Sequence, residues 1–328
     1  MAEKVTIATV ARRAQVSRQT VSNVINAPHI VREETRRRVE EAIAELGYRA
    51  NQAARQMRTG RSRLVAVRIE PTRDGINGWV LDRFLHGLTE AAAVQGYRVM
   101  LYTADEPKDE ISTYEDLLAA YDLDAFVLHG TDHGDPRPQW LTERGVPFVT
   151  FGRPWDAPHD RSWVDIDGAA GTGQVTRRLI EAGHRRIAFI GWPPGSGTGD
   201  DRRAGWSREL VACGMAPDLD ARTQDGVDQG EACAAELLAL DAPPTALVCA
   251  SDSLAVGALR AVGDHGAAVA GFDDTPVAQA VGLTSVSQPL PEAAARCMEM
   301  LTHLLDGNPA GAQAPVLLVP SLVVRKTA

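Results

Sequence analysis

Four polar side chains between residues 18 and 23 could form hydrogen bonds with the edges of DNA bases. They are Arg18, Gln19, Ser22 and Asn23, and helical spacing places them on one outward face. An arginine can donate two hydrogen bonds to guanine O6 and N7, and a glutamine can pair with adenine N6 and N7. The pattern therefore predicts a helix that presents base-recognising side chains from its N-terminal part.

Two helices joined by a tight turn would hold these side chains in place. Thr6 and Ser17 each precede an apolar helical stripe, and each hydroxyl can accept a hydrogen bond from a free N–H in the first turn. The stripes consist of Ile7, Val10, Ala11 and Ala14 in the first helix and of Val21, Val24 and Ile25 in the second. We expect a third helix over residues 33–46, ended by Gly47. The unit is therefore predicted to be a helix-turn-helix.

The charge distribution favours a nucleic-acid partner for this head. Residues 1–63 hold 13 Lys and Arg residues against 6 Glu residues and no Asp, a net charge of +7. The whole chain carries −9, so the remainder carries −16. A basic head on an acidic body suits a head that contacts phosphates and a body that does not. The alternative, a small amphipathic bundle without a partner, explains neither the hydrogen-bonding face nor this segregation.

Length and composition indicate a globular protein of two or three domains. The chain has 328 residues, of which 44% are hydrophobic. It contains no apolar run of about 18 residues, so no membrane span is expected, and its N-terminus has no secretory-signal pattern. The four cysteines, Cys213, Cys233, Cys249 and Cys297, lack C-x-x-C spacing and are interpreted as buried thiols. We therefore expect a cytoplasmic protein with no metal site and no other cofactor.

From Leu64 onward, short apolar runs alternate with helical stretches. The runs that we interpret as strands span residues 64–69, 97–102, 125–128, 147–151, 186–190, 246–249, 268–271 and 316–319. This alternation predicts parallel sheets covered by helices on both faces. Two consecutive sets predict two doubly wound lobes. Ligands of such folds bind beyond the carboxyl ends of the strands, so a cleft between the lobes is the expected binding site.

Several motifs are shared with a known family of regulators. In the head they are Val5-Thr-Ile, Val10-Ala, Ala14, Val16-Ser17, Thr20-Val21-Ser22, Val24 and Asn26, followed by Thr35-Arg36, Val39, Ala42, Leu46-Gly47-Tyr48, Asn51 and Ala54. In the body they are GHRRIAFIG at residues 183–191, Arg202-x-x-Gly205 and Gly271-Phe272-Asp273-Asp274. With these motifs in order over nearly its whole length, the chain resembles the lactose-repressor/galactose-repressor (LacI/GalR) family.

The resemblance implies a small all-α helix-turn-helix head and an α/β two-lobed core like that of periplasmic binding proteins. Its implied domains are the head at residues 1–50, a hinge helix and linker at 51–63, an N-terminal lobe at 64–162 with 290–320, and a C-terminal lobe at 163–289. The implied assembly is a homodimer on near-palindromic, double-stranded operator DNA.

The resemblance also implies a role for individual residues of the head and hinge. Arg18 and Gln19 would contact bases in the major groove, and Asn23 a base or a phosphate. Phosphate contacts would come from Thr6, Ser17, Thr20 and Asn26. The hinge helix, residues 51–59, would lie in the minor groove of bound operator, with Ala54 in the groove and Met57 as an apolar wedge between bases. The alternative for Met57 is a contact between two hinge helices.

An effector site is implied in the body. Arg202 would bond ligand hydroxyls or a carboxylate, Asp273 would hold sugar hydroxyls, and Gln288 would lie near the cleft. Ser251 stands where many relatives have Asn, which would shorten or remove a ligand contact. The alternatives are a turn-capping role for Asp273 and a pairing of Arg202 with Asp200 or Asp201.

Tryptophans provide a separate indication of the ligand. Trp79, Trp155, Trp163 and Trp192 fall in predicted loops after strands or just before helices. A flat indole face matches the C–H face of a pyranose ring, so we assign Trp79, Trp163 and Trp192 to the effector site. A carbohydrate of more than one ring is favoured over a purine. The alternative for each tryptophan is packing between the lobes.

No catalytic residues are predicted. The glycines of residues 195–199 lack the Lys-Ser/Thr that completes a phosphate-binding loop, and the chain has no G-x-S-x-G motif and no zinc-ligand spacing. The expected function is a sequence-specific transcriptional repressor, associated with the nucleoid when bound to operator and released by a small sugar. The alternative is a corepressor-dependent regulator of the same family that binds a purine or a phosphorylated metabolite.

Overall fold

The computed structural model describes residues 5–48, 60–70, 76, 78–104, 107–156, 162–307 and 314–328. The chain divides into two compact units, Met1–Ser62 and Arg63–Ala328. The predicted hinge helix, with Ala54 and Met57, lies outside the described residues. No helix in the described ranges is both long and apolar enough to cross a bilayer.

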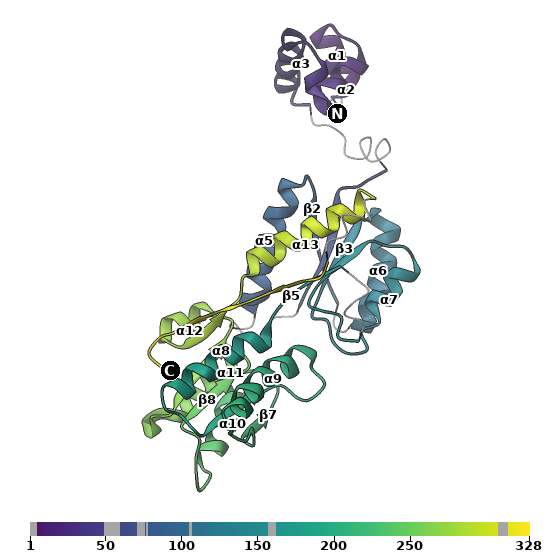
Figure 1. Ribbon diagram of the computed structural model, residues 1–328. Helices are drawn as coiled ribbons and strands as arrows, with labels where there is room; N and C mark the ends of the chain where they lie inside the picture. The colour runs from purple at the N-terminus through teal and green to yellow at the C-terminus, as the bar shows by residue number, and fades with distance from the viewer. Residues whose placement is uncertain are drawn as a thin grey trace. The chain divides into compact units, whose positions relative to one another are not determined.

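The first unit is a small helical head (Figure 1). It consists of α1 (Ile7–Ala14), α2 (Arg18–Asn26), a short 3-10 helix η1 (Pro28–Ile30) and α3 (Glu33–Leu46). Thr6 and Ser17 are the N-caps of α1 and α2, as predicted, and Gly47 ends α3 with φ of +62°. A left-handed residue at this position is the ordinary helix stop. The three helices share one apolar cluster around Val10, Val21 and Val39, none of which is exposed.

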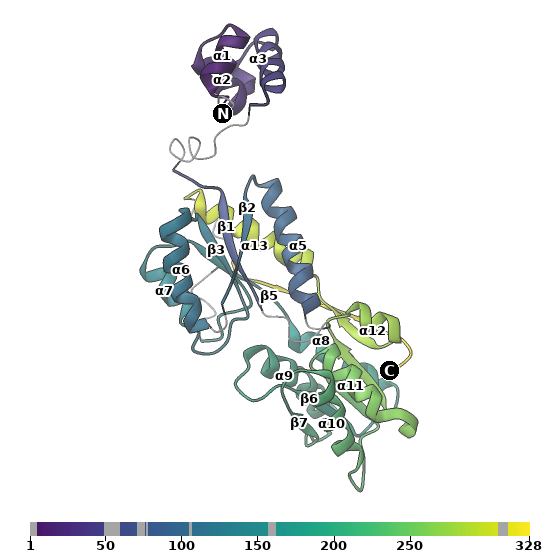
Figure 2. The ribbon, with the colours of Figure 1, turned by 180° about the vertical axis from the view of Figure 1, so that it is seen from behind.

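The second unit contains two six-stranded sheets, and the first has the order β11-β5-β4-β3-β1-β2. Its strands are β1 (Leu64–Ile69), β2 (Arg98–Thr103), β3 (Ala125–His129), β4 (Phe148–Phe151), β5 (Trp163–Ile166) and β11 (Val316–Leu318), all parallel. Helices α5 (Gly78–Val94) and α13 (Leu290–Leu305) lie side by side on one face, and α6 (Pro107–Tyr121) and α7 (Arg137–Glu143) on the other (Figure 2). The alternation of β1 explains this layering, because Val65 and Val67 pack toward α5 and α13 while Ala66 packs toward α6 and α7.

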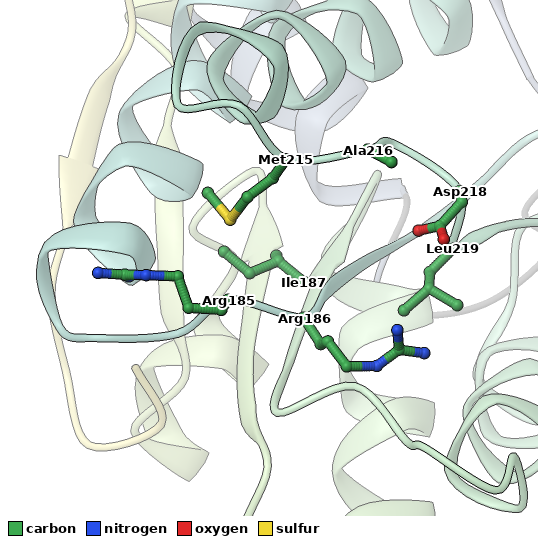
Figure 3. Close-up of a pocket in the computed structure, with 7 residues that line it drawn as sticks. All are labelled: Arg185, Arg186, Ile187, Met215, Ala216, Asp218 and Leu219. Atoms are coloured by element: carbon green, nitrogen blue, oxygen red, sulfur yellow. The ribbon is translucent and has the colours of Figure 1, made fainter.

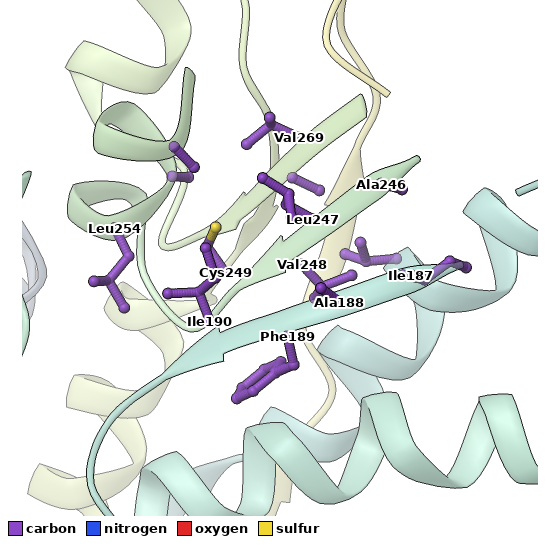
Figure 4. Close-up of a cluster of buried hydrophobic side chains, with 14 of the residues drawn as sticks. Ile187, Ala188, Phe189, Ile190, Ala246, Leu247, Val248, Cys249, Leu254 and Val269 are labelled. Carbon is purple, nitrogen blue, oxygen red and sulfur yellow. The ribbon is translucent and has the colours of Figure 1, made fainter. Parts of the chain in front are cut away.

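The second sheet has the order β12-β10-β9-β8-β6-β7. Its strands are β6 (Ile187–Gly191), β7 (Asp220–Arg222), β8 (Ala246–Cys249), β9 (Ala268–Phe272), β10 (Thr284–Ser287) and β12 (Ser321–Val323). Its helices are α8 (Gly168–Glu181), α9 (Gly197–Ala212), α10 (Val227–Leu238), α11 (Asp252–Val262) and α12 (Pro276–Val281), with a 3-10 turn η2 (Gly263–His265) after α11. Figure 4 shows Phe189 on one side of the strands and Leu247 and Cys249 on the other, so both faces of the sheet are buried.

This architecture confirms the predicted fold class, with one departure and several corrections. Strand β12 runs antiparallel to β10, so the second sheet is not wholly parallel. Strand β5 pairs with β4 in the first sheet, so the chain crosses to the second lobe after Ile166 and not at residue 163. Strands β5, β7, β10 and β12 were not predicted, because each has only three or four residues and at least one of them is polar. Cys213 is exposed and Cys233 is only partly buried, contrary to the expectation of four buried thiols.

Candidate functional site

The exposed end of α2 is the first candidate surface. Arg18 and Gln19 are exposed at its N-terminus, while Val21 and Val24 fix the helix to the core. The Gln19 side-chain amide donates a 2.9 Å hydrogen bond to Oδ1 of Asn23, which was predicted to contact a base or a phosphate, so the two side chains support each other across one turn. This hydrogen bond uses one N–H of the Gln19 amide, so the exposed side chain keeps a second N–H donor and its carbonyl acceptor.

The four predicted phosphate contacts also have structural roles in the head. Thr6 forms a capping box with Thr9, and Ser17 accepts a 3.0 Å hydrogen bond from the N–H of Thr20. The Asn26 amide donates to the Ser22 carbonyl at 2.6 Å. The Ser17 and Thr20 hydroxyls also share a 2.9 Å hydrogen bond, so one of the two keeps its O–H free to donate. That O–H can contact a phosphate while the pair caps the start of α2.

Arg202 and Asp273 form the centre of the second candidate site. Arg202 lies on α9, 7% exposed at the side chain, and its Nη1 donates to the Ala250 carbonyl at 2.5 Å. The same Nη1 lies 3.5 Å from Oδ1 of Asp273, which directly follows β9. The guanidinium carbon lies over two aromatic rings, 3.7 Å from the centroid of Phe272 and 5.2 Å from that of Trp192. Both residues thus meet at the carboxyl edge of the second sheet, where α/β folds bind ligands.

The Asp273 carboxyl is held in a strained and desolvated position. Its backbone has φ of +108°, a conformation that residues with a side chain rarely adopt. Gln288, which follows β10, donates a 2.6 Å hydrogen bond to its Oδ1. Burial raises the pKa of Asp273 to about 8; the Arg202 guanidinium opposes this shift, and the neighbouring Asp252 and Asp225 add to it. Strain and a raised pKa are both typical of functional positions.

Two donors at this centre have no acceptor among the described residues. They are Nε of Arg202 and the indole N–H of Trp192, both buried. The predicted alternative pairs of Arg202 do not form: Asp200 accepts from the N–H of Gly195 at 2.9 Å, and Asp201 from the N–H of Ala169 at 3.0 Å. Because buried donors in proteins are nearly always paired, these two fit a site that receives acceptors from a ligand.

Two carboxylates near this centre, Asp225 and Asp252, were not predicted from the sequence. Asp225 accepts a 2.5 Å hydrogen bond from the Ser251 hydroxyl, and that hydroxyl also caps α11. Asp252 is fully buried, bonded by Ser285 at 2.6 Å and by the N–H of Thr275 at 2.7 Å, and burial raises its pKa to about 6. Ser251 itself is fully buried, so in this structure it supports Asp225. The unpredicted strand β7, just before Asp225, is the reason that this residue was overlooked.

The predicted tryptophans occupy different environments. Trp192 directly follows β6 and contributes to the Arg202 centre. Trp79 is in the first turn of α5, with the Arg83 guanidinium 5.6 Å from its ring, and is not in a loop. Trp163 is a strand residue of β5 in register with Thr150, and only 8% exposed. The roles of Trp79 and Trp163 in ligand binding therefore stay predictions.

The first lobe contains a buried polar network that no sequence pattern indicated. Glu110 accepts hydrogen bonds from Tyr102 at 2.6 Å and from Tyr114 at 2.7 Å, and it pairs with Arg137 at 2.8 Å. Arg137 is fully buried and also pairs with Asp135. The network joins α6 and α7 to the carboxyl ends of β2 and β3, so it fixes the edge of the first sheet.

Two other features of the described residues do not extend these sites. A depression of about 190 Å³, bordered by Arg186, Met215 and Asp218, lies where β6 and β7 begin (Figure 3). This is the edge of the second sheet opposite to the Arg202 centre. Among the described residues, no cluster of three His, Cys, Asp or Glu side chains could hold a metal ion.

Comparison with known proteins gives matches over both units. The pattern of "Bacterial regulatory proteins, lacI family" matches residues 6–51, and that of the "Periplasmic binding protein-like domain" matches residues 176–328. The HTH-type transcriptional regulator CelR of Thermobifida fusca is 36% identical over 98% of both chains. A solved structure of a CelR–cellobiose complex matches 99% of this chain over 100% of its own length, with a TM-score of 0.72 and 33% identity. A lac repressor dimer bound to operator and the anti-inducer ONPF has a TM-score of 0.83 and 26% identity over 99% of both chains.

Proposed function

Because this chain belongs to the LacI family of HTH-type transcriptional regulators, which are not enzymes, we propose that it is a sugar-released repressor. In this proposal a homodimer binds a near-palindromic operator through α2 of each head. A small neutral carbohydrate binds at the Arg202 centre, between the lobes, and lowers the affinity for operator. The protein would act in the cytoplasm, on the nucleoid while operator is bound.

The observation that carries the sugar proposal is the pair of donors without a described acceptor, Arg202 Nε and Trp192 Nε1, beside the acceptor Asp273. A sugar hydroxyl can accept from one group and donate to another. The centre offers both kinds of partner, together with the aromatic surface of Trp192 for the C–H face of a ring. A relative of 33% identity is known as a complex with cellobiose, which supports this class of ligand.

The charges around the centre favour a neutral ligand over a phosphorylated metabolite. The cation Arg202 pairs with Asp273, and the neighbouring charges of Asp252 and Asp225 also act on the Asp273 carboxyl. A phosphate would add negative charge to a site that has no second cation among the described contacts of Arg202 and Asp273.

The proposed release depends on the hinge, residues 51–59. A helix of this length is marginal in water unless it packs on a partner. Two hinge helices would pack on each other and on operator, with Ala54 in the minor groove and Met57 between bases. Sugar binding would separate the two N-terminal lobes of the dimer, and the hinge helices would then unfold.

The test uses the full-length protein and duplexes that it selects from a random pool. Fluorescence anisotropy would measure its affinity for a selected duplex with and without cellobiose. We expect cellobiose to weaken binding for the native chain and to have no effect on Arg202→Met. The proposal is wrong if mono- and disaccharides leave operator affinity unchanged while a purine or a sugar phosphate strengthens it, which is the outcome for the corepressor alternative.

A further inference from the structure

The glycine-rich segment at residues 195–199 receives no role from the proposed site. It forms the N-terminal turn of α9, with Ser196 as N-cap. The first N–H groups of a helix have no partner within the helix. The N–H of Gly197 has a partner outside the helix, because it donates a 2.8 Å hydrogen bond to Oδ1 of Asp132. Asp132 belongs to the other lobe, in the loop after β3, so this hydrogen bond joins the two lobes.

A tryptophan of the first lobe packs against the same glycine. Trp155, in the loop after β4, lies so close to Gly197 that a Cβ at this position would overlap the indole ring. No other residue type therefore fits at position 197 while the lobes are in this arrangement. Trp155 is held in turn by its own lobe, since its indole N–H donates to the Thr131 carbonyl at 3.3 Å.

The neighbouring side chains bind the two lobes together over one further turn of α9. Arg153 pairs with Asp165 of its own lobe at 2.6 Å and with Asp201 of the second lobe at 3.3 Å. The loops after β3 and β4 are also tied to each other, because the Thr131 hydroxyl donates to the Arg153 carbonyl at 3.0 Å. The first lobe thus presents a single surface to the start of α9, and Asp201 is the immediate neighbour of Arg202.

We propose that Asp132 and Trp155 are positioning residues that hold the N-terminal turn of α9 at Gly197 and so couple closure of the lobes to ligand binding at Arg202. We call the contacts of Asp132 and Trp155 with Gly197 the α9 latch. The coupling follows because α9 carries both Gly197 and Arg202, so a movement of the helix affects both. The link to ligand binding rests on the proposed function, whereas the latch does not.

Amide hydrogen exchange of the full-length protein tests the latch without any ligand. The Gly197 amide reports the latch directly, because only the other lobe provides its acceptor. We expect exchange at Gly197 to be at least about tenfold faster in Asp132→Ala and in Trp155→Ala than in the native chain. The amide of Ala170 is the internal control, since Asp167 of the same lobe caps it at 2.7 Å, and its rate should not change. Equal rates at Gly197 in the native chain and in both variants would overturn the latch.

A double-mutant cycle tests the coupling with cellobiose as the probe. Gly197→Ala should weaken cellobiose binding about tenfold, because the new methyl group forces the lobes apart. In a Trp155→Ala background the same change should have almost no further effect, since the overlap is gone. Gly173→Ala is the matched control, because its Cβ would make only ordinary contacts. Additive effects of Gly197→Ala and Trp155→Ala would overturn the coupling.

The two experiments separate a failure of the latch from a failure of the proposed function. If cellobiose does not bind to the native chain, the choice of probe fails, and amide exchange alone decides whether the latch exists. If cellobiose binds and the Gly197 amide is unprotected, the sugar site stands and the latch is wrong.

Discussion

The Arg202 guanidinium and the Asp273 carboxyl come within 3.5 Å of each other from separate elements, α9 and the loop after β9. Both side chains are at least nine-tenths buried, so each depends on the other to offset its desolvation. The Arg202 guanidinium is not saturated, because its Nε has no acceptor in the described part of the chain. The pair therefore serves two purposes in this structure, the stability of the second lobe and the presentation of polar atoms to a ligand.

Removal of the cation from this pair should destabilise the protein. At pH 9, above the pKa of about 8, the ionised Asp273 carboxyl of Arg202→Met has no cation to offset its burial, and we expect a loss of about 3 kcal/mol in the free energy of unfolding. Urea denaturation measures the loss. In the double variant with Asp273→Asn much of this loss should be recovered, because no uncompensated charge remains. Losses that simply add in the double variant would show that the two groups do not interact.

The raised pKa of Asp273 predicts a pH-dependent effect of Asp273→Asn. The pKa of this group is about 8 in the folded chain against 3.8 as the ordinary value, so its ionisation opposes folding. In the native chain this contribution to stability is complete below about pH 4 and is lost as the pH rises through about 8. Asp273→Asn should therefore gain stability relative to the native chain between pH 5 and pH 8.5, on the order of a few kcal/mol.

Thermal unfolding at these two pH values checks this prediction. The exposed Asp241→Asn is the control, because it removes a carboxylate that is in contact with solvent. If the stability difference between Asp273→Asn and the native chain is the same at both pH values, the raised pKa of Asp273 is wrong.

The first-lobe network predicts the opposite pH dependence at Glu110. Burial alone would raise the pKa of Glu110, but Arg137 and the hydroxyls of Tyr102 and Tyr114 lower it below its ordinary value of 4.5. The ionised group therefore stabilises the fold above about pH 4.5, and this contribution is lost as the pH falls through the lowered pKa. Glu110→Gln should cost about 3 kcal/mol at pH 7. The difference in free energy of unfolding between Glu110→Gln and the native chain should shrink in acid. Urea denaturation followed by circular dichroism measures this difference at each pH.

The exposed position of Arg18 predicts a change in base preference. In Arg18→Ala the head keeps its core but loses a bidentate donor, so the penalty for a wrong base at one position of the half-site should fall by about 1–3 kcal/mol. Binding to a set of single-base duplex variants measures this effect. Thr20→Ala is the comparison, because the loss of a phosphate contact should weaken all duplexes about equally. If Arg18→Ala preserves the native rank order of the duplexes, Arg18 does not recognise a base.

The proposed switch predicts reciprocal coupling between operator and sugar. If cellobiose weakens operator binding by some factor, operator must weaken cellobiose binding by the same factor. Titration calorimetry of cellobiose into free protein and into protein saturated with operator measures the two cellobiose affinities. Their ratio should equal the factor by which cellobiose weakens operator binding. Equal affinities in the two titrations would exclude a switch of this kind.

Local patterns were sufficient to predict the head and the general architecture. Caps and helical stripes act within a few residues, so the types and spacing of neighbouring residues were enough to assign Thr6, Ser17 and Gly47. Buried strands such as β1, β3 and β8 are continuous apolar runs, which their composition shows. The short strands β7 and β10 could not be predicted, because their stability comes from neighbouring strands and not from their own residues.

Within the candidate sites, the sequence by itself determined which residue types were present: Arg202 and Asp273 in motifs, Gln288 from the resemblance, and an outward polar face on α2. Only the tertiary structure decided the partners. It joined Arg202 to Asp273 and not to Asp200 or Asp201, added Asp225, and placed Trp155 against Gly197 across the two lobes. The physical reason is that a helix cap or stripe depends on neighbours along the chain, whereas these contacts form only when separate strands and helices bring distant residues to one edge of a sheet.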